Sequence, residues 1–152
     1  MIEFLKINKL LLVSLLSLLI GLISLTGLIR KKLNLFLSGF FIIGILIVEA
    51  EFRRYADSHT THHLFFGSIF LIQAVLSLPF LNGGGWTKDW GLTKRLMALL
   101  IINVTAIIAI KNYDYNLILS SSEIKYIALE HAYYALLVMV AIVISAPFKA
   151  KT

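Results

Sequence analysis

Residues 49–63 read EAEFRRYADSHTTHH, and on both sides of them the chain is almost unbroken Leu, Ile, Phe and Val. This polar stretch holds three acids, two arginines and three of the four histidines in the chain. Ionisable groups are costly near lipid, so an apolar chain that gathers them in one place marks a site of chemistry or of contact with other chains. The apolar segments on either side of the stretch decide the fold.

The composition of the chain predicts a membrane protein. Of its 152 residues, 59% are hydrophobic and 14% are charged, whereas a soluble domain carries about 25% charged residues. A soluble fold of this length would have too few polar residues to cover its exterior, so lipid must surround most of the chain. We expect an all-α fold, a polytopic integral membrane helical bundle that forms one domain over residues 1–152.

The lengths of the apolar runs predict the number of helices, because a helix of about 20 apolar residues crosses a hydrocarbon core of about 30 Å. Arg30, Lys31 and Lys32 end the first run, which favours a membrane helix over a cleaved signal peptide. So short a link also predicts an antiparallel hairpin with the second run. The five predicted membrane helices span about 10–29, 33–52, 64–81, 95–111 and 121–146.

Two features of the composition limit the chemistry. The chain has no Cys, which excludes disulfides, thiolate metal sites and iron–sulfur clusters. A metal or haem would have to be held by His, carboxylate, Tyr or Met. The formal net charge of +6 comes from basic residues scattered in small groups at segment ends, where membrane topology requires them. Nucleic acid is therefore not an expected partner.

The polar stretch contains a charged ladder. Glu49, Arg53 and Asp57 follow one another at four-residue spacing, so on a helix they share one face and Arg53 can bridge two carboxylates. This spacing, and the lack of Gly or Pro as far as His63, predicts that the second helix continues beyond the lipid at least to Asp57. We interpret the ladder as a structural ion-pair set that keeps these charges satisfied at the membrane boundary.

The histidines are candidates for a ligand site. His59 and His63 are four residues apart, the spacing at which one helix supplies two ligands to one metal, and His62 lies beside them. Glu130 and His131 interrupt the apolar run of the last helix and are the candidates for further ligands. Together these residues would bind a metal, haem or pigment. The alternative interpretation is a solvated polar loop whose side chains diverge.

The string HTTHH at residues 59–63 resembles the H-x-x-H-H box of membrane fatty-acid desaturases and hydroxylases. In that family several such boxes together hold a pair of irons that activates dioxygen. This chain has one such box, and the resemblance covers five of its 152 residues. The resemblance implies a diiron site here only if another chain supplies the remaining ligands.

Three functions fit the sequence. The first is a small non-catalytic subunit of a larger membrane complex, of respiratory, photosynthetic or oxygenase type, which helix packing and the charged ladder would assemble or stabilise. The second is a membrane redox or metal protein in which His59, His63 and His131, with Glu130, ligate haem or metal. The third is a small proton-coupled transporter that uses Glu49 and Glu130, although the chain lacks repeat symmetry.

The expected surroundings follow from the first of these functions. The lipid bilayer and other membrane protein subunits are the expected partners. The expected membrane is a bacterial or archaeal cell membrane, or a thylakoid or other organellar inner membrane.

Overall fold

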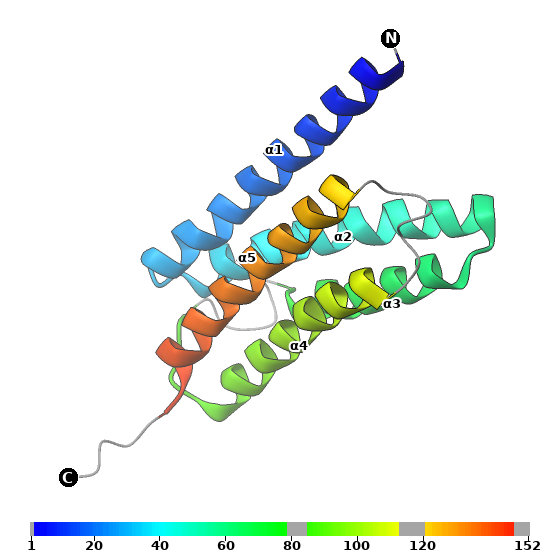
Figure 1. Ribbon diagram of the computed structural model, residues 1–152. Coiled ribbons are helices and arrows are strands. Elements are labelled where there is room, and N and C mark those ends of the chain that lie inside the picture. The colour runs from blue at the N-terminus through cyan, green and yellow to red at the C-terminus, as the bar shows by residue number, and fades with distance from the viewer. Residues whose placement is uncertain (1, 79–84, 113–120, 148–152) are drawn as a thin grey trace.

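The computed structural model describes residues 2–78, 85–112 and 121–147, with side chains for residues 12, 13, 15–78, 85–112 and 124–147. Within these ranges the chain forms five helices and no strand (Figure 1), so the predicted all-α fold is confirmed. The helices are α1 (Ile2–Ile29), α2 (Leu33–Ser58), α3 (Thr61–Leu76), α4 (Trp90–Asn112) and α5 (Ser121–Ser145).

Three of these helices, α2, α4 and α5 from Ile124 to Ser145, are long and apolar enough to cross a membrane. The segment Leu15–Ile29 of α1 and the whole of α3 are shorter apolar helices. Large apolar side chains lie exposed on the outside of the bundle, which is the surface expected when lipid replaces water as the surrounding solvent. The fold is therefore that of an all-helical membrane protein.

Several helix ends differ from the prediction. The first helix begins at Ile2 rather than near residue 10, and α4 begins at Trp90 rather than near residue 95. The Asp89 side chain explains the second difference, since its carboxylate accepts a hydrogen bond of 2.7 Å from the backbone N–H of Leu92 and so satisfies a donor at the start of the helix. The predicted continuation of the second helix at least to Asp57 is confirmed, since α2 ends at Ser58.

The predicted end of the third helix at residue 81 is wrong, because α3 ends at Leu76. The guanidinium group of Arg95 on α4 donates hydrogen bonds to the carbonyl oxygens of Leu76 and Leu78, the latter at 3.0 Å. These bonds satisfy carbonyl groups that a continuing helix would have used. At sixteen residues, α3 is about 24 Å long, shorter than a hydrocarbon core of about 30 Å.

A tight hairpin joins α1 to α2, as the short basic link predicts. Gly27 lies directly against the backbone of α2, where an added Cβ would be 2.2 Å from the backbone nitrogen of Phe36. The Ser24 hydroxyl donates a hydrogen bond of 2.9 Å to the Phe36 carbonyl. The two helices therefore approach each other closely through small residues, as membrane helices commonly do.

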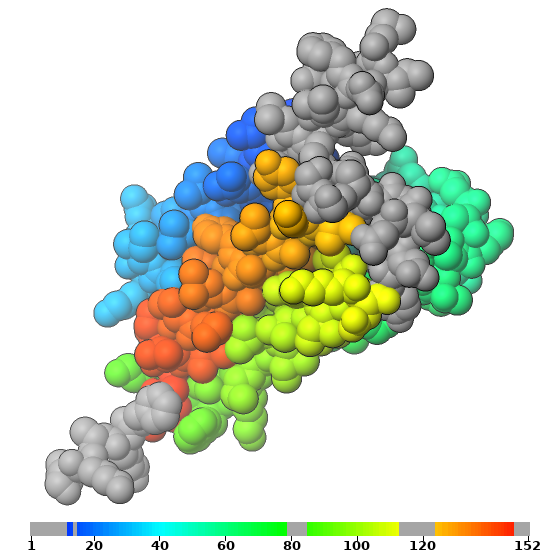
Figure 2. All heavy atoms as spheres, viewed as in Figure 1, coloured from blue at the N-terminus to red at the C-terminus, as the bar shows by residue number. Residues whose placement is uncertain are grey.

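The largest apolar core lies where α1, α2, α4 and α5 meet. Phe36, Phe40, Leu96, Leu99 and Val138 are fully buried there. A second apolar cluster joins α3 to α4. In the space-filling view α5 lies between α1 and α4 on one face of the bundle (Figure 2), which leaves the opposite side of α4 to pack against α3.

Candidate functional site

A buried carboxylate–imidazole pair joins α2 to α3 at one end of the bundle. Glu51 and His63 are both almost completely buried, and one carboxylate oxygen of Glu51 lies 2.7 Å from Nδ1 of His63. The other oxygen accepts a hydrogen bond of 2.7 Å from Arg54. Glu51 therefore holds the imidazole ring in a fixed orientation.

His62 extends this pair into a row of three groups. Its Nε2 atom lies 3.1 Å from Nε2 of His63. Because an ionised Glu51 carboxylate can only accept, His63 donates to it from Nδ1. In the neutral form of the His63 ring the lone pair is then on Nε2, and His62 donates to it.

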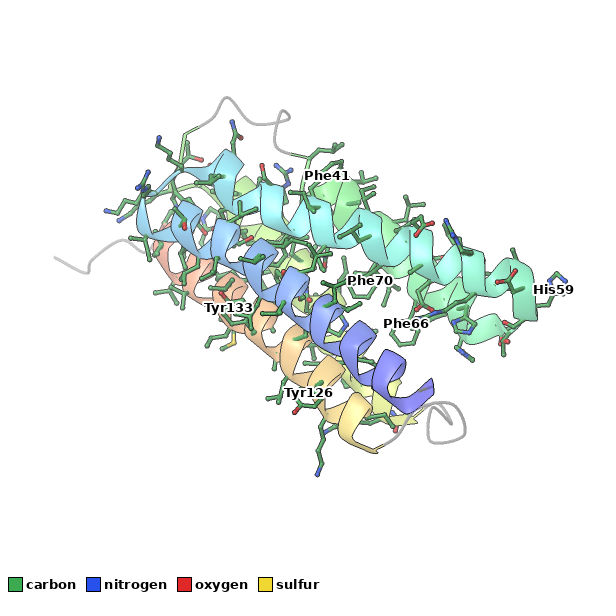
Figure 3. The ribbon with its side chains drawn as sticks, turned by 90° about the horizontal axis from the view of Figure 1, so that it is seen from above. Phe41, His59, Phe66, Phe70, Tyr126 and Tyr133 are labelled. Atoms are coloured by element: carbon green, nitrogen blue, oxygen red, sulfur yellow. The ribbon has the colours of Figure 1, made fainter. Side chains whose placement is uncertain are left out.

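His59 does not share a helical face with His63, and that prediction is wrong. The second helix ends at Ser58 and the third begins at Thr61. His59 lies between them at the tip of the turn (Figure 3), exposed and in the left-handed conformation with a φ of 53°. Its backbone N–H donates to the carbonyl of Tyr55 at 2.7 Å, which is a common way for a helix to end.

The charged ladder is present in part. Arg53 forms an ion pair with Glu49, and both side chains are largely exposed. Within the described part of the chain no ion pair joins Arg53 to Asp57. An exposed pair of this kind contributes about 0.2–1 kcal/mol to stability. Glu51 is not part of the ladder, but it is buried, so its contacts matter more for the structure of this stretch.

His131 lies in the interior of the bundle, apart from the polar stretch. Its ring stacks on Phe70 at a centroid distance of 5.1 Å, and its Nδ1 atom lies 3.4 Å from Oδ1 of Asn103. The Asn103 amide donates to Gln73 Oε1 at 3.0 Å, and the Gln73 amide donates to the carbonyl of Phe40 at 3.1 Å. A single row of hydrogen bonds thus crosses from α5 through α4 and α3 to α2.

The predicted ligand set is not assembled in one place. Among the described residues no group of three His, Asp or Glu side chains is arranged to hold a metal ion. Of His59, His62, His63, His131 and Glu130, the structure brings together the imidazole rings of His62 and His63 only. Neither Gln73 nor Asn103 was among the predicted site residues, although each is a lone carboxamide within an apolar run.

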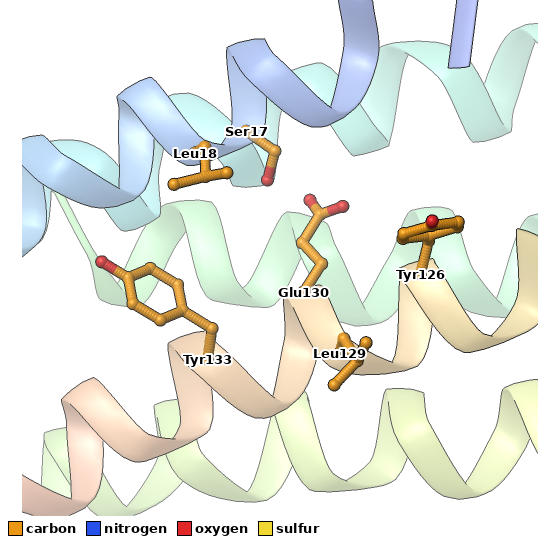
Figure 4. Close-up of a pocket in the computed structure, with 6 residues that line it drawn as sticks. All are labelled: Ser17, Leu18, Tyr126, Leu129, Glu130 and Tyr133. Carbon is orange, nitrogen blue, oxygen red and sulfur yellow. The ribbon is translucent and has the colours of Figure 1, made fainter. Parts of the chain in front are cut away.

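Glu130 lines a pocket of about 200 Å³ between α1 and α5. Its carboxyl group points toward Ser17 on α1, and Tyr126 and Tyr133 lie on either side of it (Figure 4). Leu18 and Leu129 complete the lining. Since Leu129 and Leu18 are mostly exposed, the pocket lies on the outer surface of the bundle, where lipid or another chain would cover it.

No protein-family model, curated protein or solved structure matches this chain. The class of the protein therefore rests on the fold, which is that of an all-helical membrane protein.

Proposed function

We propose that this protein is a small, non-catalytic subunit of a larger membrane protein complex, and that it binds a transmembrane helix of a partner chain at the pocket between α1 and α5. The observation that supports this proposal is Glu130, an ionisable residue inside the apolar segment Ile124–Ser145 that faces an outer pocket. Ionisable groups inside membrane segments are costly and usually mark functional contacts.

The surroundings of Glu130 favour a partner that carries positive charge. The pocket supplies one serine, two tyrosines and two leucines, and none of these side chains is cationic. A carboxylate that leaves water is stabilised chiefly by an opposite charge with good hydrogen-bond geometry. A Lys or Arg on a neighbouring membrane helix would provide that charge and would place apolar side chains against Leu18 and Leu129.

The apolar segments of this chain indicate that the partner is a different protein rather than a second copy. Residues 15–29, 33–48, 64–78, 96–110 and 126–145 contain no Lys or Arg. A second copy would therefore have no cation to offer from within the membrane. Assembly into a complex of respiratory, photosynthetic or oxygenase type, in a bacterial or archaeal cell membrane or an organellar inner membrane, is part of the same proposal.

The proposal can be tested by solubilising the membranes of the source cell in a mild detergent and measuring the size of the particle that contains this chain. We expect a particle larger than the 17.1 kDa chain in its micelle, with a second polypeptide in fixed stoichiometry. Leu129→Trp should fill the pocket and release the chain. Leu136→Trp is the matched control, because Leu136 is a similarly exposed leucine of α5 that does not line the pocket.

Two results would contradict the proposal. One is a wild-type chain that is monomeric in its native membrane. The other is a complex that survives both Leu129→Trp and Glu130→Gln unchanged. Removing one partner of a buried ion pair costs about 3–5 kcal/mol, so Glu130→Gln should weaken the complex more than a hundredfold if a cation faces this residue.

A further inference from the structure

We propose that His62 and His63 form a binding site for one divalent transition-metal ion, with Glu51 as the positioning residue behind His63. This site lies at the α2–α3 turn and involves none of the residues that line the Glu130 pocket. The inference therefore does not depend on the proposed docking of a partner helix.

The spacing of the two imidazole nitrogens fits a shared metal. Zinc–imidazole bonds are about 2.0–2.1 Å long, which places two nitrogens on a tetrahedral ion about 3.3 Å apart. Two neighbouring nitrogens of a square-planar Cu²⁺ or Ni²⁺ ion would be about 2.9 Å apart at the same bond length. The observed distance between the Nε2 atoms of His62 and His63 is 3.1 Å, which lies between these two values.

Glu51 orients His63 in the way that a carboxylate usually orients a metal-bound histidine. A metal-bound histidine commonly donates its other N–H to a carboxylate, which fixes the tautomer and makes the ligating nitrogen more basic. The Glu51 carboxylate accepts from Nδ1 of His63 at 2.7 Å, and Arg54 holds the other Glu51 oxygen at 2.7 Å. The lone pair on Nε2 of His63 is therefore in place before a metal arrives.

Binding requires a change of tautomer at His62. When both rings are neutral and no metal is bound, the Nε2–H group of His62 donates a hydrogen bond to Nε2 of His63. A neutral His62 that moves this proton to Nδ1 presents a second Nε2 lone pair, so the metal replaces the hydrogen bond between the rings without a net loss of protons. Water molecules then complete the coordination of the ion, because His62 is only partly buried.

The chemistry of the ligands selects the class of metal. Imidazole nitrogen suits Zn²⁺, Cu²⁺ and Ni²⁺, and among divalent ions Cu²⁺ binds a given nitrogen site most tightly. The absence of Cys removes the thiolates that would favour Cu⁺. We therefore expect the affinity to follow the order Cu²⁺ above Zn²⁺ and Ni²⁺, with no binding of Mg²⁺ or Ca²⁺, which prefer oxygen ligands.

The experiment uses the full chain, purified in detergent without a histidine tag, and measures Cu²⁺ binding by electron paramagnetic resonance and Zn²⁺ binding by calorimetry. We expect one ion per chain and a nitrogen coupling pattern from two imidazoles. His62→Gln should abolish that pattern while leaving the Glu51–His63 pair intact. Glu51→Gln should weaken binding by about tenfold to a hundredfold, the usual effect of removing a carboxylate behind a metal ligand.

His59→Gln is the matched control, because His59 is an exposed histidine of the same turn whose ring packs against Tyr55. It should leave affinity and spectrum unchanged. The proposal is overturned if the wild-type chain binds no Cu²⁺ or Zn²⁺, or if His62→Gln binds as tightly as wild type. It is equally overturned if His59→Gln removes the signal. Thermal unfolding of each metal-free variant shows whether it is folded, and an added metal should raise the midpoint only in chains that keep both His62 and His63.

Discussion

Asn103 on α4 and Gln73 on α3 meet in the buried interior of the bundle, where the Asn103 amide nitrogen lies 3.0 Å from the Gln73 side-chain oxygen. Each amide donates toward α2, and His131 donates to the Asn103 oxygen from the other side. Along the row His131 donates to Asn103, Asn103 donates to Gln73, and Gln73 donates to the Phe40 carbonyl, so the direction of donation is the same throughout. The Asn103 amide also donates to the Leu99 carbonyl at 2.9 Å. This row fixes the register of four helices whose remaining contacts are mostly apolar.

Asn103→Leu should therefore destabilise the bundle, because it leaves polar atoms of Gln73 and His131 without partners. The expected loss is about 1–3 kcal/mol per buried group left unsatisfied. The loss would be measured by unfolding in mixed detergent micelles. Asn34→Leu is the matched control: the side-chain oxygen of Asn34 is buried on α2 and has no hydrogen-bond partner among the described residues. Equal losses for the two variants would contradict a stabilising role for the row.

Arg95→Leu should destabilise the end of α3, since the Arg95 guanidinium satisfies the carbonyl groups of Leu76 and Leu78. Hydrogen bonds to a charged group contribute about 1.5–3 kcal/mol each. Hydrogen exchange of the last turn of α3 should become faster. Lys94→Leu, which removes an exposed neighbouring charge, should leave that exchange rate unchanged, and a similar acceleration there would refute the capping role.

Gly27→Ala should force α1 and α2 apart, because the new methyl group would lie 2.2 Å from a backbone nitrogen of α2 rather than against a movable side chain. Overpacking of this kind costs about 1–3 kcal/mol. Among the described residues no atom lies within 4 Å of a Cβ added at Gly85, so Gly85→Ala serves as the control. A thermal midpoint that is unchanged in both variants would show that the hairpin is not closely packed.

Stability should also depend on pH through Asp89. The hydroxyl of Thr87 and the backbone N–H groups of Leu92 and Gly91 lower the pKa of this carboxyl group from its ordinary value of 3.8. The stabilisation is therefore fully present above pH 3.8 and is lost as the pH falls through the lowered value.

Asp89→Asn tests this dependence, because asparagine also caps a helix but does not titrate. The difference in thermal midpoint between wild type and Asp89→Asn should shrink as the pH falls from neutral to below the lowered pKa of Asp89. A difference that stays constant over that range would contradict the assigned role.

The apolar run lengths were sufficient to predict five helices, of which three are long and apolar enough to cross a membrane. Each run forms a helix because within lipid its backbone groups must form hydrogen bonds to one another. The extension of α2 to Asp57 was also predictable, since this segment contains no helix-breaking Gly or Pro. The Glu51–His63 pair could not be predicted from the sequence. It joins residues twelve positions apart, and it forms only because α2 ends at Ser58 with His59 in the left-handed conformation.

The row from His131 to Phe40 was unpredictable for a related reason. A lone Gln or Asn in an apolar run signals a buried contact, but the partner depends on the register between helices. That register follows from the packing of α3 against α4, where Phe66, Phe70 and Ala106 are buried together. Local sequence patterns carry no information about this register.

The most direct test of the proposed docking is site-specific photocrosslinking in the native membrane, with benzoylphenylalanine placed at position 129 and, as a control, at position 136. Position 129 lines the pocket beside Glu130, whereas position 136 is an exposed site on the same helix outside it. We expect position 129 to give one discrete product with a different membrane protein, joined at an apolar segment that contains Lys or Arg, and position 136 to give lipid products alone. Lipid products alone at both positions, or a product that contains a second copy of this chain, would contradict the account.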